Sequence, residues 1–373
     1  MQKCDVLIAG GGPAGSSCAW KLSKAGLKVL VLDQHTFPRN KVCGGWITPA
    51  VLEELQIQTE DYAARNVLQP ITGFLTGVMG GIQTVTRYCR PVSYGVRRCE
   101  FDYYLLRRCG AKLQQSTPFR QMRRSGHEWV VNEEFTASVV VGAGGHFCPV
   151  ARFLGAVLKR ERVVAAQEVE FEIDENLRAG CAVSGEIPEL YFCSDLKGYG
   201  WCFRKGNFLN IGLGRMGNDG LNSQVERFCE FLTTERRIPA ERVRKLKGHA
   251  YLLYGVTPRR LIDDGVLLTG DAAGLAYPLS GEGIRPAIES GLMAADALLN
   301  ANGRYTADNL ESYRRALVRR FGQVKEGGLA TITGLFPPGM ICSLGRMLLK
   351  SRSFSRSVLL DRWFLHAHEA PLI

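Results

Sequence analysis

The hexapeptide Gly10-Gly11-Gly12-Pro13-Ala14-Gly15 decides the fold of this 373-residue chain. Residues 5–9 before it, Asp-Val-Leu-Ile-Ala, predict a strand buried on both faces, and residues 14–25 after it predict a helix. Residues 28–33 predict a second strand, which ends on the acid Asp33. A GxGxxG turn in this context is typical of a βαβ unit that binds a dinucleotide.

The residue types in this motif have separate physical reasons. Gly10 permits the tight turn, Gly12 lets the backbone approach a pyrophosphate, and Gly15 lets the helix and strand pack closely. The N-terminus of the helix supplies unpaired N–H groups and a positive dipole. Asp33 lies where an acid accepts a hydrogen bond from a ribose hydroxyl. The motif alone does not distinguish NAD from FAD.

The composition, 46% hydrophobic and 22% charged, is that of a globular protein. The net charge of +11 indicates anionic partners, but basic and aromatic residues do not interleave, so we expect no nucleic-acid partner. The twelve cysteines form no CxxC pair and have no histidine at metal-ligand spacing, so we expect no metal site and a reducing, cytoplasmic location. No secretory signal is predicted, and no transmembrane helix, since Pro337 and Pro338 interrupt the uncharged stretch 327–345.

The rest of the chain alternates between two kinds of pattern. An irregular segment, 36–49, follows the second strand. The further predicted elements are a helix over 101–113, a buried strand over 139–141, an alternating strand over 168–173 with one face in water, strands over 199–203 and 208–213, a strand over 266–268 and a helix over 283–299. Parallel-type segments at the two ends therefore enclose antiparallel-type strands, which predicts a nucleotide-binding domain with an inserted substrate domain.

The domain boundaries follow from this arrangement. We expect residues 1–75, 95–160 and 255–305 to form the nucleotide-binding domain, and residues 76–94 and 161–254 to form the substrate domain. We expect residues 306–373 to form a helical region that closes the substrate cavity.

A second glycine-rich segment specifies the cofactor. Thr269-Gly270-Asp271-Ala272-Ala273-Gly274, then Pro278 and Gly281-Glu282-Gly283, resembles the FAD-dependent family of aromatic hydroxylases, flavin halogenases and geranylgeranyl reductases. The resemblance implies that Asp271 binds the ribityl chain and that the later glycines open a helix beside the pyrimidine edge of the flavin. A helix N-terminus there would stabilise developing anionic charge. The alternative for Asp271 is a helix-capping acid.

Two shorter segments match the same family. Arg98-Cys99-Glu100-Phe101-Asp102 with Leu105 is similar to its RxxFDxxL segment, in which the arginine contacts the cofactor phosphates. The alternative for Arg98 is a surface arginine on a basic protein. The segment from Val141 to Arg152 resembles the family's ADGxxS segment, but Gly144 replaces the usual Asp and Cys148 the usual Ser, which removes side-chain hydrogen bonds.

Two further segments favour the reductase branch. Residues 37–45, Phe-Pro-Arg-Asn-Lys-Val-Cys-Gly-Gly, are similar to the FPRxKxCGG segment of geranylgeranyl reductases, whose Cys-Gly-Gly lies close to the flavin ring. Residues 199–203, with 210–214 after them, resemble the reductases' YxWxFP…VGxG segment, which lines the substrate cavity, although Arg204 stands where Pro is usual. The resemblance implies an α/β fold: a glutathione-reductase-type FAD-binding Rossmann domain with an inserted antiparallel-sheet substrate domain and C-terminal helices.

The motifs and the resemblance together assign two sets of site residues. The expected cofactor-binding residues are Gly10, Gly12, Pro13, Ala14, Gly15, Asp33, Gln34, Arg39, Lys41, Cys43, Gly44, Gly45, Arg98, Gly144, Gly270, Asp271, Pro278, Gly281, Gly283 and Ile284. The candidate catalytic residues are Cys43, Tyr199 and Trp201. The alternatives are a small buried residue for Cys43, and pocket wall and sheet packing for Tyr199 and Trp201.

The expected activity is transfer of hydride from reduced FAD to a carbon–carbon double bond of an isoprenoid or other apolar substrate. No second GxGxxG turn between a predicted strand and a predicted helix is visible for NAD(P)H, so NAD(P)H would bind transiently, or a separate electron-donor protein would supply electrons. Two alternatives stay open: an O2-dependent monooxygenase or halogenase-like enzyme, and a flavin-binding protein without turnover. The basic and apolar residues of 346–365 predict either a helix at a membrane surface, and hence a peripheral location, or a helix that closes over the substrate domain.

Overall fold

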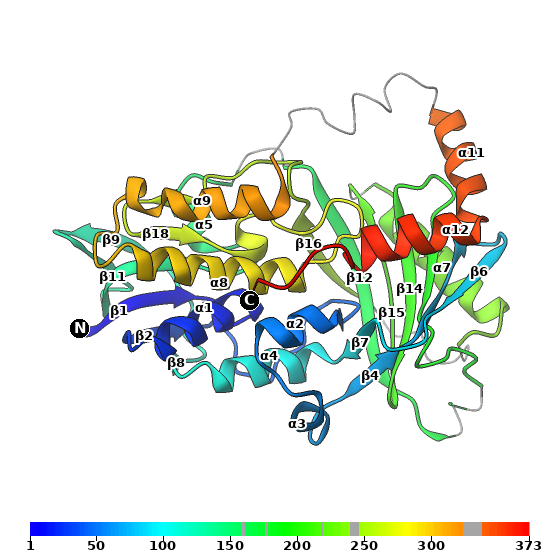
Figure 1. Ribbon diagram of the computed structural model, residues 1–373, viewed down its shortest axis with the longest axis horizontal. Helices are drawn as coiled ribbons and strands as arrows, with labels where there is room; N and C mark the ends of the chain where they lie inside the picture. The colour runs from blue at the N-terminus through cyan, green and yellow to red at the C-terminus, as the bar shows by residue number, and fades with distance from the viewer. Residues whose placement is uncertain are drawn as a thin grey trace. The chain divides into compact units, whose positions relative to one another are not determined.

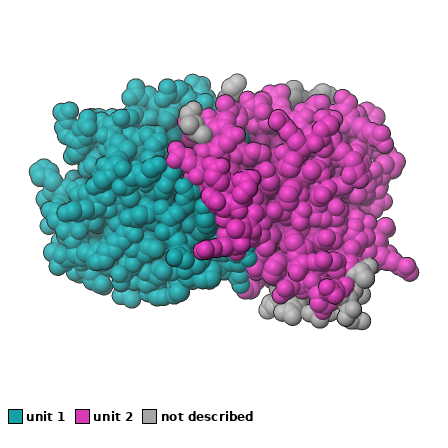
Figure 2. Space-filling model, turned by 60° about the horizontal axis from the view of Figure 1, so that its bottom comes forward, with its two compact units in different colours: residues 1–40, 99–162, 251–325 teal, residues 41–98, 163–250, 326–373 magenta. Residues whose placement is uncertain are grey.

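The computed structural model describes residues 1–157, 161–175, 178, 180–217, 219–238, 246–323 and 338–372. The chain divides into two compact units, each assembled from three separated stretches (Figure 2). Unit 1 comprises residues 1–40, 99–162 and 251–325, and unit 2 comprises residues 41–98, 163–250 and 326–373. Most of the stretch 327–345, in which two prolines exclude a transmembrane helix by sequence, lies outside the described residues. No described helix combines the length and the apolar character needed to cross a bilayer.

Unit 1 contains an eight-stranded sheet with the strand order β17-β18-β11-β1-β2-β8 and a hairpin of β9 and β10 beside β11. The strands are β1 (Gln2–Ala9), β2 (Val29–Leu32), β8 (Lys112–Gln114), β9 (Met122–Ser125), β10 (Glu128–Val131), β11 (Phe135–Gly142), β17 (Ile262–Asp263) and β18 (Val266–Leu268). Strands β18, β11, β1, β2 and β8 run parallel. The central residues of β1, β2, β11 and β18 are buried on both faces, as the continuous apolar runs predict, whereas β8 at the edge is half-exposed.

Helices cover this sheet and are shown in Figure 1. They are α1 (Pro13–Lys24), α4 (Arg98–Arg108), α5 (Pro149–Phe153), α8 (Ile284–Asn300) and α9 (Ala307–Phe321). Helices α1 and α8 lie side by side (Figure 1), and a Cβ on Gly291 of α8 would come within 2.3 Å of the Ala14 carbonyl oxygen of α1. Glycine at 291 therefore permits the close packing of these two helices.

Unit 2 contains a seven-stranded, mostly antiparallel sheet in the order β16-β12-β15-β14-β13-β5-β6 and a three-stranded sheet β3-β7-β4. The strands are β3 (Trp46–Ile47), β4 (Leu68–Ile71), β5 (Gly73–Val78), β6 (Gln83–Arg87), β7 (Ser93–Val96), β12 (Val163–Glu172), β13 (Glu189–Phe192), β14 (Gly198–Lys205), β15 (Phe208–Met216) and β16 (Lys247–Leu252). Helix α7 (Leu221–Thr234) packs its apolar side, including Phe228 and Leu232, into the core of this sheet.

The remaining helices of unit 2 are short or lie near the C-terminus. They are α2 (Pro49–Glu54), α3 (Thr59–Ala63), α11 (Pro338–Leu349), α12 (Arg352–Phe354) and a π-helix over Ser355–Phe364. The π-helix buries Leu359, Leu360 and Phe364. The basic and apolar residues of 346–365 thus form helices, as their spacing predicts.

The structure confirms the predicted elements, with one correction of extent and one of burial. The helix predicted over 101–113 ends at Arg108, because Gly110 has φ +72°, and residues 112–114 form β8 instead. The alternation over 168–173 predicts a strand with one face in water, and this interpretation is wrong because Glu168 is only 6% exposed. Its carboxylate is hydrogen-bonded inside the unit, so a polar residue type there does not mean a wet face. The segment expected to be irregular, 36–49, also contains the short strand β3.

The division into units differs from the predicted domain boundaries by a few residues near 95–98, 161–162 and 251–254, and by longer stretches at two places. Residues 41–75 belong to unit 2 because β3 and β4 pair with β7 in its three-stranded sheet. Residues 306–325 belong to unit 1 because α9 packs against α8.

Candidate functional site

The first glycine turn lies at the carboxyl end of β1 in unit 1. Gly10 has φ +120°, and a Cβ there would lie 2.4 Å from the Ala143 carbonyl oxygen. A Cβ on Gly15 would lie 1.9 Å from the Gly10 carbonyl oxygen. Both positions therefore exclude any larger residue. Gly12, by contrast, has only the Arg39 guanidinium within 4 Å of its Cβ position, so its backbone is open to a ligand.

Asp33 ties the end of β2 to this turn. Its Oδ2 accepts a hydrogen bond of 2.8 Å from the Gly11 N–H, and its Oδ1 accepts one of 2.8 Å from the His35 N–H. Each carboxylate oxygen still has a second lone pair, which a ribose hydroxyl could use. Gln34 is exposed, with its Nε2 3.3 Å from the Nε2 of His35.

Arg39 lies beside the same turn. Its Nη2 is 3.5 Å from Oδ2 of the fully buried Asp102 on α4, and its guanidinium lies over the Phe37 ring at 4.7 Å. Its Nε is buried and has no hydrogen-bond partner among the described residues. Its Nη2 lies 3.4 Å from the Cβ position of Gly12, so the side chain places a positive charge beside the open backbone of Gly12, which fits a pyrophosphate.

Asp102 was missed by sequence reasoning, although it lies within the RxxFDxxL segment. That segment drew attention to its arginine alone, and the acid orients a different arginine, Arg39. Arg98 itself is 8% exposed, begins α4 and belongs to unit 2. Its contact with cofactor phosphates stays a prediction.

The second glycine turn meets the first within unit 1. Gly270, in the 3-10 helix Gly270–Ala272, has φ +58°, and its Cβ position is 3.1 Å from Cβ of Ala14 and 3.2 Å from Cβ of Ala287. Its N–H donates a 2.9 Å hydrogen bond to Oγ of Ser290 on α8. Pro13 and Ala14 begin α1, so the structure brings two turns more than 250 residues apart to one helix N-terminus.

The segment before α8 completes this group. Gly283 caps α8, Ile284 is its buried first residue, and Oδ1 of Asp271 lies 3.4 Å from the Cβ position of Gly283. Gly281 has φ +69°, and Pro278 is exposed. Burial raises the pKa of Glu282 to about 7, and its Oε1 accepts a 2.8 Å hydrogen bond from the N–H of Arg285.

The turn after β11 has less to offer a ligand. Gly144 is exposed, and its Cβ position is 3.3 Å from the sulfur of Cys148. Cys148 is fully buried, and burial raises the pKa of its thiol. The contact of Gly144 with a cofactor stays a prediction.

Arg259 is a second residue that the sequence did not single out. Its Nη1 donates to the carbonyls of Ala272 at 3.0 Å and His146 at 3.2 Å, and its Nε donates to Glu161 at 2.8 Å. The guanidinium of Arg259 therefore stabilises the second glycine turn through its hydrogen bond to the Ala272 carbonyl. A lone arginine among 47 basic residues carries no sequence signal of this role.

The residues 41–45 belong to unit 2. Lys41 has its Nζ 3.0 Å from Nε2 of His249. The Cβ position of Gly44 is 3.1 Å from Cε2 of Phe203 and 3.5 Å from Nε1 of Trp201, so the loop lies against β14. We name Cys43-Gly44-Gly45 the CGG loop.

A buried polar network lies beneath the CGG loop. The Asn210 Nδ2 donates to Oε1 of Glu168 at 2.7 Å, to the Cys43 carbonyl at 3.2 Å and to Oε2 of Glu170 at 3.2 Å. Burial raises the pKa of Glu168 to about 7. Burial would also raise the pKa of Glu170, but the ammonium of Lys205 and hydrogen bonds from Lys205, Asn210 and Arg97 lower it below its ordinary value.

Tyr199 and Trp201, the two aromatic candidates on β14, belong to an aromatic cluster in unit 2. Tyr199 contacts Phe364 of the π-helix with ring centroids 5.3 Å apart. Trp46 stacks on Phe203 at 5.4 Å and meets Phe364 edge-on at 5.5 Å. Trp201 donates from Nε1 to Oδ1 of Asn210 at 2.7 Å. These contacts agree with the alternative of pocket wall and sheet packing, and a catalytic role for Tyr199 or Trp201 stays a prediction.

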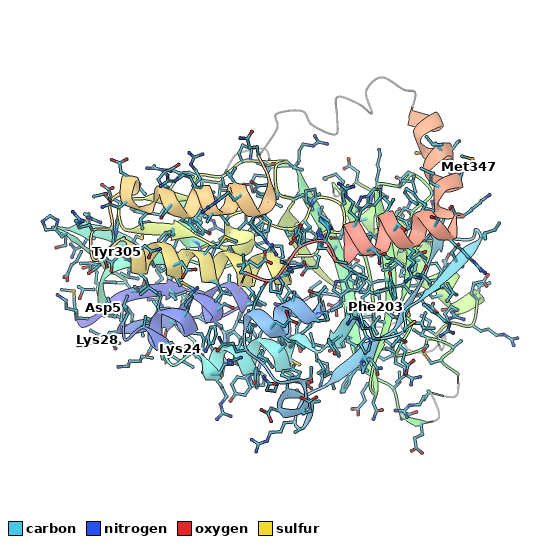
Figure 3. All side chains as sticks on the ribbon, in the orientation of Figure 1. Asp5, Lys24, Lys28, Phe203, Tyr305 and Met347 are labelled. Atoms are coloured by element: carbon cyan, nitrogen blue, oxygen red, sulfur yellow. The ribbon has the colours of Figure 1, made fainter. Side chains whose placement is uncertain are left out.

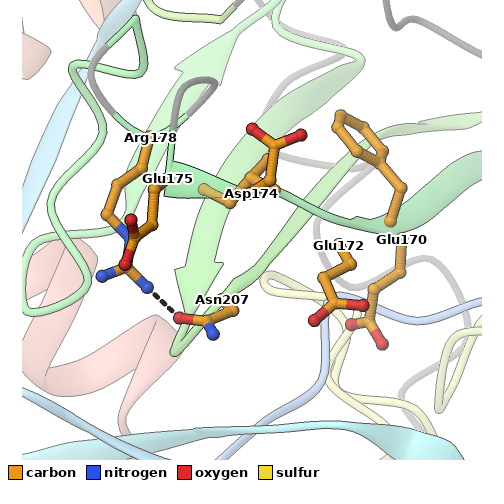
Figure 4. A pocket seen from close by; sticks show the side chains of 8 residues that line it. Glu170, Glu172, Asp174, Glu175, Arg178 and Asn207 are labelled. Carbon is orange, nitrogen blue, oxygen red and sulfur yellow. Dashed lines mark hydrogen bonds between the residues drawn. The ribbon is translucent and has the colours of Figure 1, made fainter.

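A cavity of about 720 Å³ opens at the far end of β12 in unit 2 (Figure 4). It is lined by Glu170, Phe171, Glu172, Ile173, Asp174, Glu175, Arg178 and Asn207. The carboxylates have one cationic side chain among them, Arg178, which is hydrogen-bonded to Asn207. None of the predicted site residues lines this acidic cavity.

Comparison with known proteins assigns the family. Residues 3–324 match the family of the FAD binding domain. The digeranylgeranylglycerophospholipid reductase of Methanocaldococcus jannaschii is 29% identical over 329 residues, which cover 83% of this chain and 81% of that protein. The geranylgeranyl diphosphate reductase of Rhodobacter capsulatus is 29% identical over 324 residues, 80% of this chain and 75% of that protein. A geranylgeranyl bacteriochlorophyll reductase-like protein of Thermoplasma acidophilum shares the fold with a TM-score of 0.77 at 21% identity, covering 98% of this chain and 97% of that chain.

The chain therefore belongs to the FAD-binding-domain family, as the converging glycine turns indicate. Within that family it is an FAD-dependent oxidoreductase related to the geranylgeranyl reductases, which confirms the resemblance seen in its motifs.

The pKa of Glu168 generates a prediction on stability. Its folded-state pKa is about 7 and the ordinary value is 4.5, so between these pH values the folded state holds more protons than the unfolded state. Stability must then fall as pH rises through this window, by up to about 3 kcal/mol from this residue. We expect Glu168→Gln to remove this part of the fall in the free energy of urea unfolding between pH 5 and pH 8.

The matched control is Glu172→Gln, an exposed position on the same strand, which should keep the wild-type pH dependence. Glu282 contributes a fall of the same sign in both variants. An unchanged difference between pH 5 and pH 8 in Glu168→Gln would contradict the burial of a titrating carboxyl there.

Proposed function

We propose that this protein is a reductase that uses FAD to saturate a carbon–carbon double bond of an isoprenoid or similarly apolar substrate. FAD, when bound and reduced, supplies the hydride. The chain's own residues bind the cofactor, orient the substrate and exclude water. The observation that carries the proposal is the meeting of two glycine turns at the N-terminus of α1, with the guanidinium of Arg39 beside Gly12.

Residues of unit 1 fit the cofactor along its length. The N-terminus of α1 and Arg39 would hold the pyrophosphate, and Asp33 the adenosine ribose. Asp271 would hold the ribityl chain, and the N-terminus of α8 after Gly283 would stabilise negative charge on the flavin. Lys41, the CGG loop and Arg98 belong to unit 2, and their proposed contacts with the cofactor rest on the motif resemblance alone.

The aromatic cluster of unit 2 supports an apolar substrate. Tyr199, Trp201 and Phe203 present aromatic rings from one strand: Tyr199 packs with Phe364 and Trp201, and Phe203 stacks on Trp46. Aromatic surface of this kind suits a hydrocarbon chain. The two curated relatives described above are named for geranylgeranyl substrates, which supports the same substrate class.

The reductant belongs to the proposal as well. The GxGxxG turn after β1 is taken by the proposed FAD site. The other stretch with this spacing, residues 212–217, lies at the end of the antiparallel strand β15 and opens no helix. We therefore propose that NAD(P)H binds transiently or that a separate electron-donor protein reduces the flavin. Stopped-flow mixing of the oxidised protein with NADPH separates the two: rapid bleaching of the flavin absorbance supports NADPH, and none supports a protein donor.

The decisive experiment is carried out without oxygen. Purified, FAD-loaded protein is reduced with dithionite and mixed with geranylgeranyl diphosphate or an archaeal digeranylgeranylglycerophospholipid. We expect the absorbance of oxidised flavin to return and the product to gain two hydrogens per double bond. A product that forms only with O2 and carries its oxygen would assign the protein to the monooxygenases instead.

Arg39 provides a test of the cofactor site. We expect Arg39→Met to raise the Kd of FAD about 10- to 100-fold, because a charge-assisted hydrogen bond to phosphate is lost. Arg39→Lys, which keeps the charge but not the fork, should lose less. Arg107→Met, an exposed arginine on α4, serves as the control, and fluorescence titration of apoprotein measures all three. Equal Kd values for Arg39→Met and Arg107→Met would remove Arg39 from the site.

Helix α11 suggests how a lipid substrate is reached. Leu344 is 53% exposed and Met347, labelled in Figure 3, is 60% exposed. Arg346 and Lys350 on the same segment are exposed as well. Apolar and basic side chains together fit an anionic lipid surface. We propose that the protein is cytoplasmic and contacts the membrane peripherally through this helix.

Co-sedimentation with vesicles tests the membrane contact. At low salt we expect binding to phosphatidylglycerol vesicles and little to phosphatidylcholine vesicles, with loss of binding in the double variant Leu344→Ser/Met347→Ser. Protein that stays in the supernatant with anionic vesicles at low salt would refute the contact.

A further inference from the structure

We propose that Asn210 and Lys205 are positioning residues that fix the CGG loop for its role beside the flavin, and that Glu168 makes this hold depend on pH. The inference rests on the proposed function, because the CGG loop is the segment expected at the flavin ring. All of the contacts that carry it lie within unit 2.

All three backbone carbonyls of the CGG loop are taken by the sheets of unit 2. The Cys43 carbonyl accepts from Nδ2 of Asn210 at 3.2 Å, and the Gly44 carbonyl accepts from Nζ of Lys205 at 3.0 Å. The Gly45 carbonyl accepts from the N–H of Val96 at 2.7 Å. Two of the three hydrogen bonds thus come from the side chains of Asn210 and Lys205. These donors can be removed by mutation without changing the sequence of the CGG loop.

Lys205 is specialised for this contact. It is 1% exposed, and its three ammonium protons match three acceptors: the carbonyls of Gly44 and Val96, each at 3.0 Å, and Oε2 of Glu170 at 2.6 Å. Burying a lysine costs stability unless every donor is used. A Cβ on Gly45 would come within 2.7 Å of the same Nζ, so the loop is shaped around this ammonium.

Asn210 links the loop to the aromatic cluster. It is 1% exposed, its Nδ2 serves Cys43 and both carboxylates, and its Oδ1 accepts from the indole of Trp201 at 2.7 Å. The side-chain amide of Asn210 therefore fixes both the position of the Cys43 carbonyl and the orientation of the Trp201 ring. An asparagine that only stabilised the sheet would not make the hydrogen bond to the Cys43 carbonyl of the loop.

Glu168 is the titrating member of the network. It accepts from Asn210 and from the backbone N–H of Cys43, and the charged groups around it are Glu170 on the same strand and Lys205 on β14, with Arg97 paired to Glu170. On β16, His249 faces Lys41. Burial raises the pKa of Glu168 to about 7. Above that pH its carboxylate is charged and strengthens both bonds toward Cys43; below it, a neutral acid binds them less tightly.

Alkylation of Cys43 measures the hold on the loop. FAD-loaded protein is treated with iodoacetamide, and peptide mass spectrometry gives the rate at Cys43 divided by the rate at the exposed Cys89. We expect this ratio to rise about tenfold in Asn210→Asp, which keeps the acceptor for Trp201 but loses the donor to Cys43, and in Lys205→Met. The ratio should be unchanged in Glu172→Gln.

The pH dependence separates positioning from general stability. In the wild type the ratio should fall as pH rises through about 7, and in Glu168→Gln this step should be absent. Circular dichroism and gel filtration check folding; if Asn210→Asp does not fold, the pH step in Glu168→Gln still decides. Ratios equal to the wild type in Asn210→Asp and Lys205→Met, or a pH step that survives in Glu168→Gln, would overturn the inference.

The same samples keep the two proposals apart. If the protein binds FAD and reduces the isoprenoid substrate, but the alkylation ratio of Cys43 is the same in all variants, the proposed function stands and the inference about the loop is refuted. A protein whose ratio follows the variants but which takes up no FAD retains the anchored loop and loses the proposed function.

Discussion

The close approach of backbone to backbone at the ends of β1, β11 and β18 is the constraint on which unit 1 depends. Gly10 faces the carbonyl of Ala143, Gly15 faces the carbonyl of Gly10, and Gly270 packs on Ala14. Side chains larger than hydrogen at the first two positions would push the turn away from its neighbours. Because all three strands are parallel, their carboxyl ends meet at one edge, where ligands of open α/β sheets bind.

The sequence predicted these turns because glycine spacing and apolar runs are local signals. The sequence alone predicts the strand before Gly10, the helix after it and the acid at position 33. It also predicts the second turn at 270, through its resemblance to a family. The side-chain contacts that hold the turns in place could not be predicted from the sequence. The contact of Asp102 with Arg39 and the bonds of Arg259 to Ala272 and His146 join residues far apart in the chain, and each participant looks like an ordinary surface charge.

The alternation around Glu168 misled for a related physical reason. Because side chains alternate along a strand, every second residue lies on the same face. The residue types then suggest which of the two faces is exposed to solvent. In unit 2 the face that carries Glu168, Glu170 and Asn210 is covered, and the polar atoms on it bind one another and the CGG loop. Buried charge of this kind costs stability and is kept where geometry must be fixed. The charged residues of β12 were therefore the strongest sequence signal of a site in unit 2, and they were interpreted as solvent-facing.

The interleaved composition of the two units also constrains how the protein is made. Unit 1 is incomplete until β18 has been synthesised, and the aromatic cluster of unit 2 is incomplete until Phe364, nine residues from the end of the chain, has left the ribosome. In each unit a strand made early waits for a partner encoded far downstream: β11 waits for β18 in unit 1, and β5 waits for β13 in unit 2. Pairing of strands so distant in sequence slows folding and leaves apolar strand faces exposed for longer than in a domain built from local hairpins.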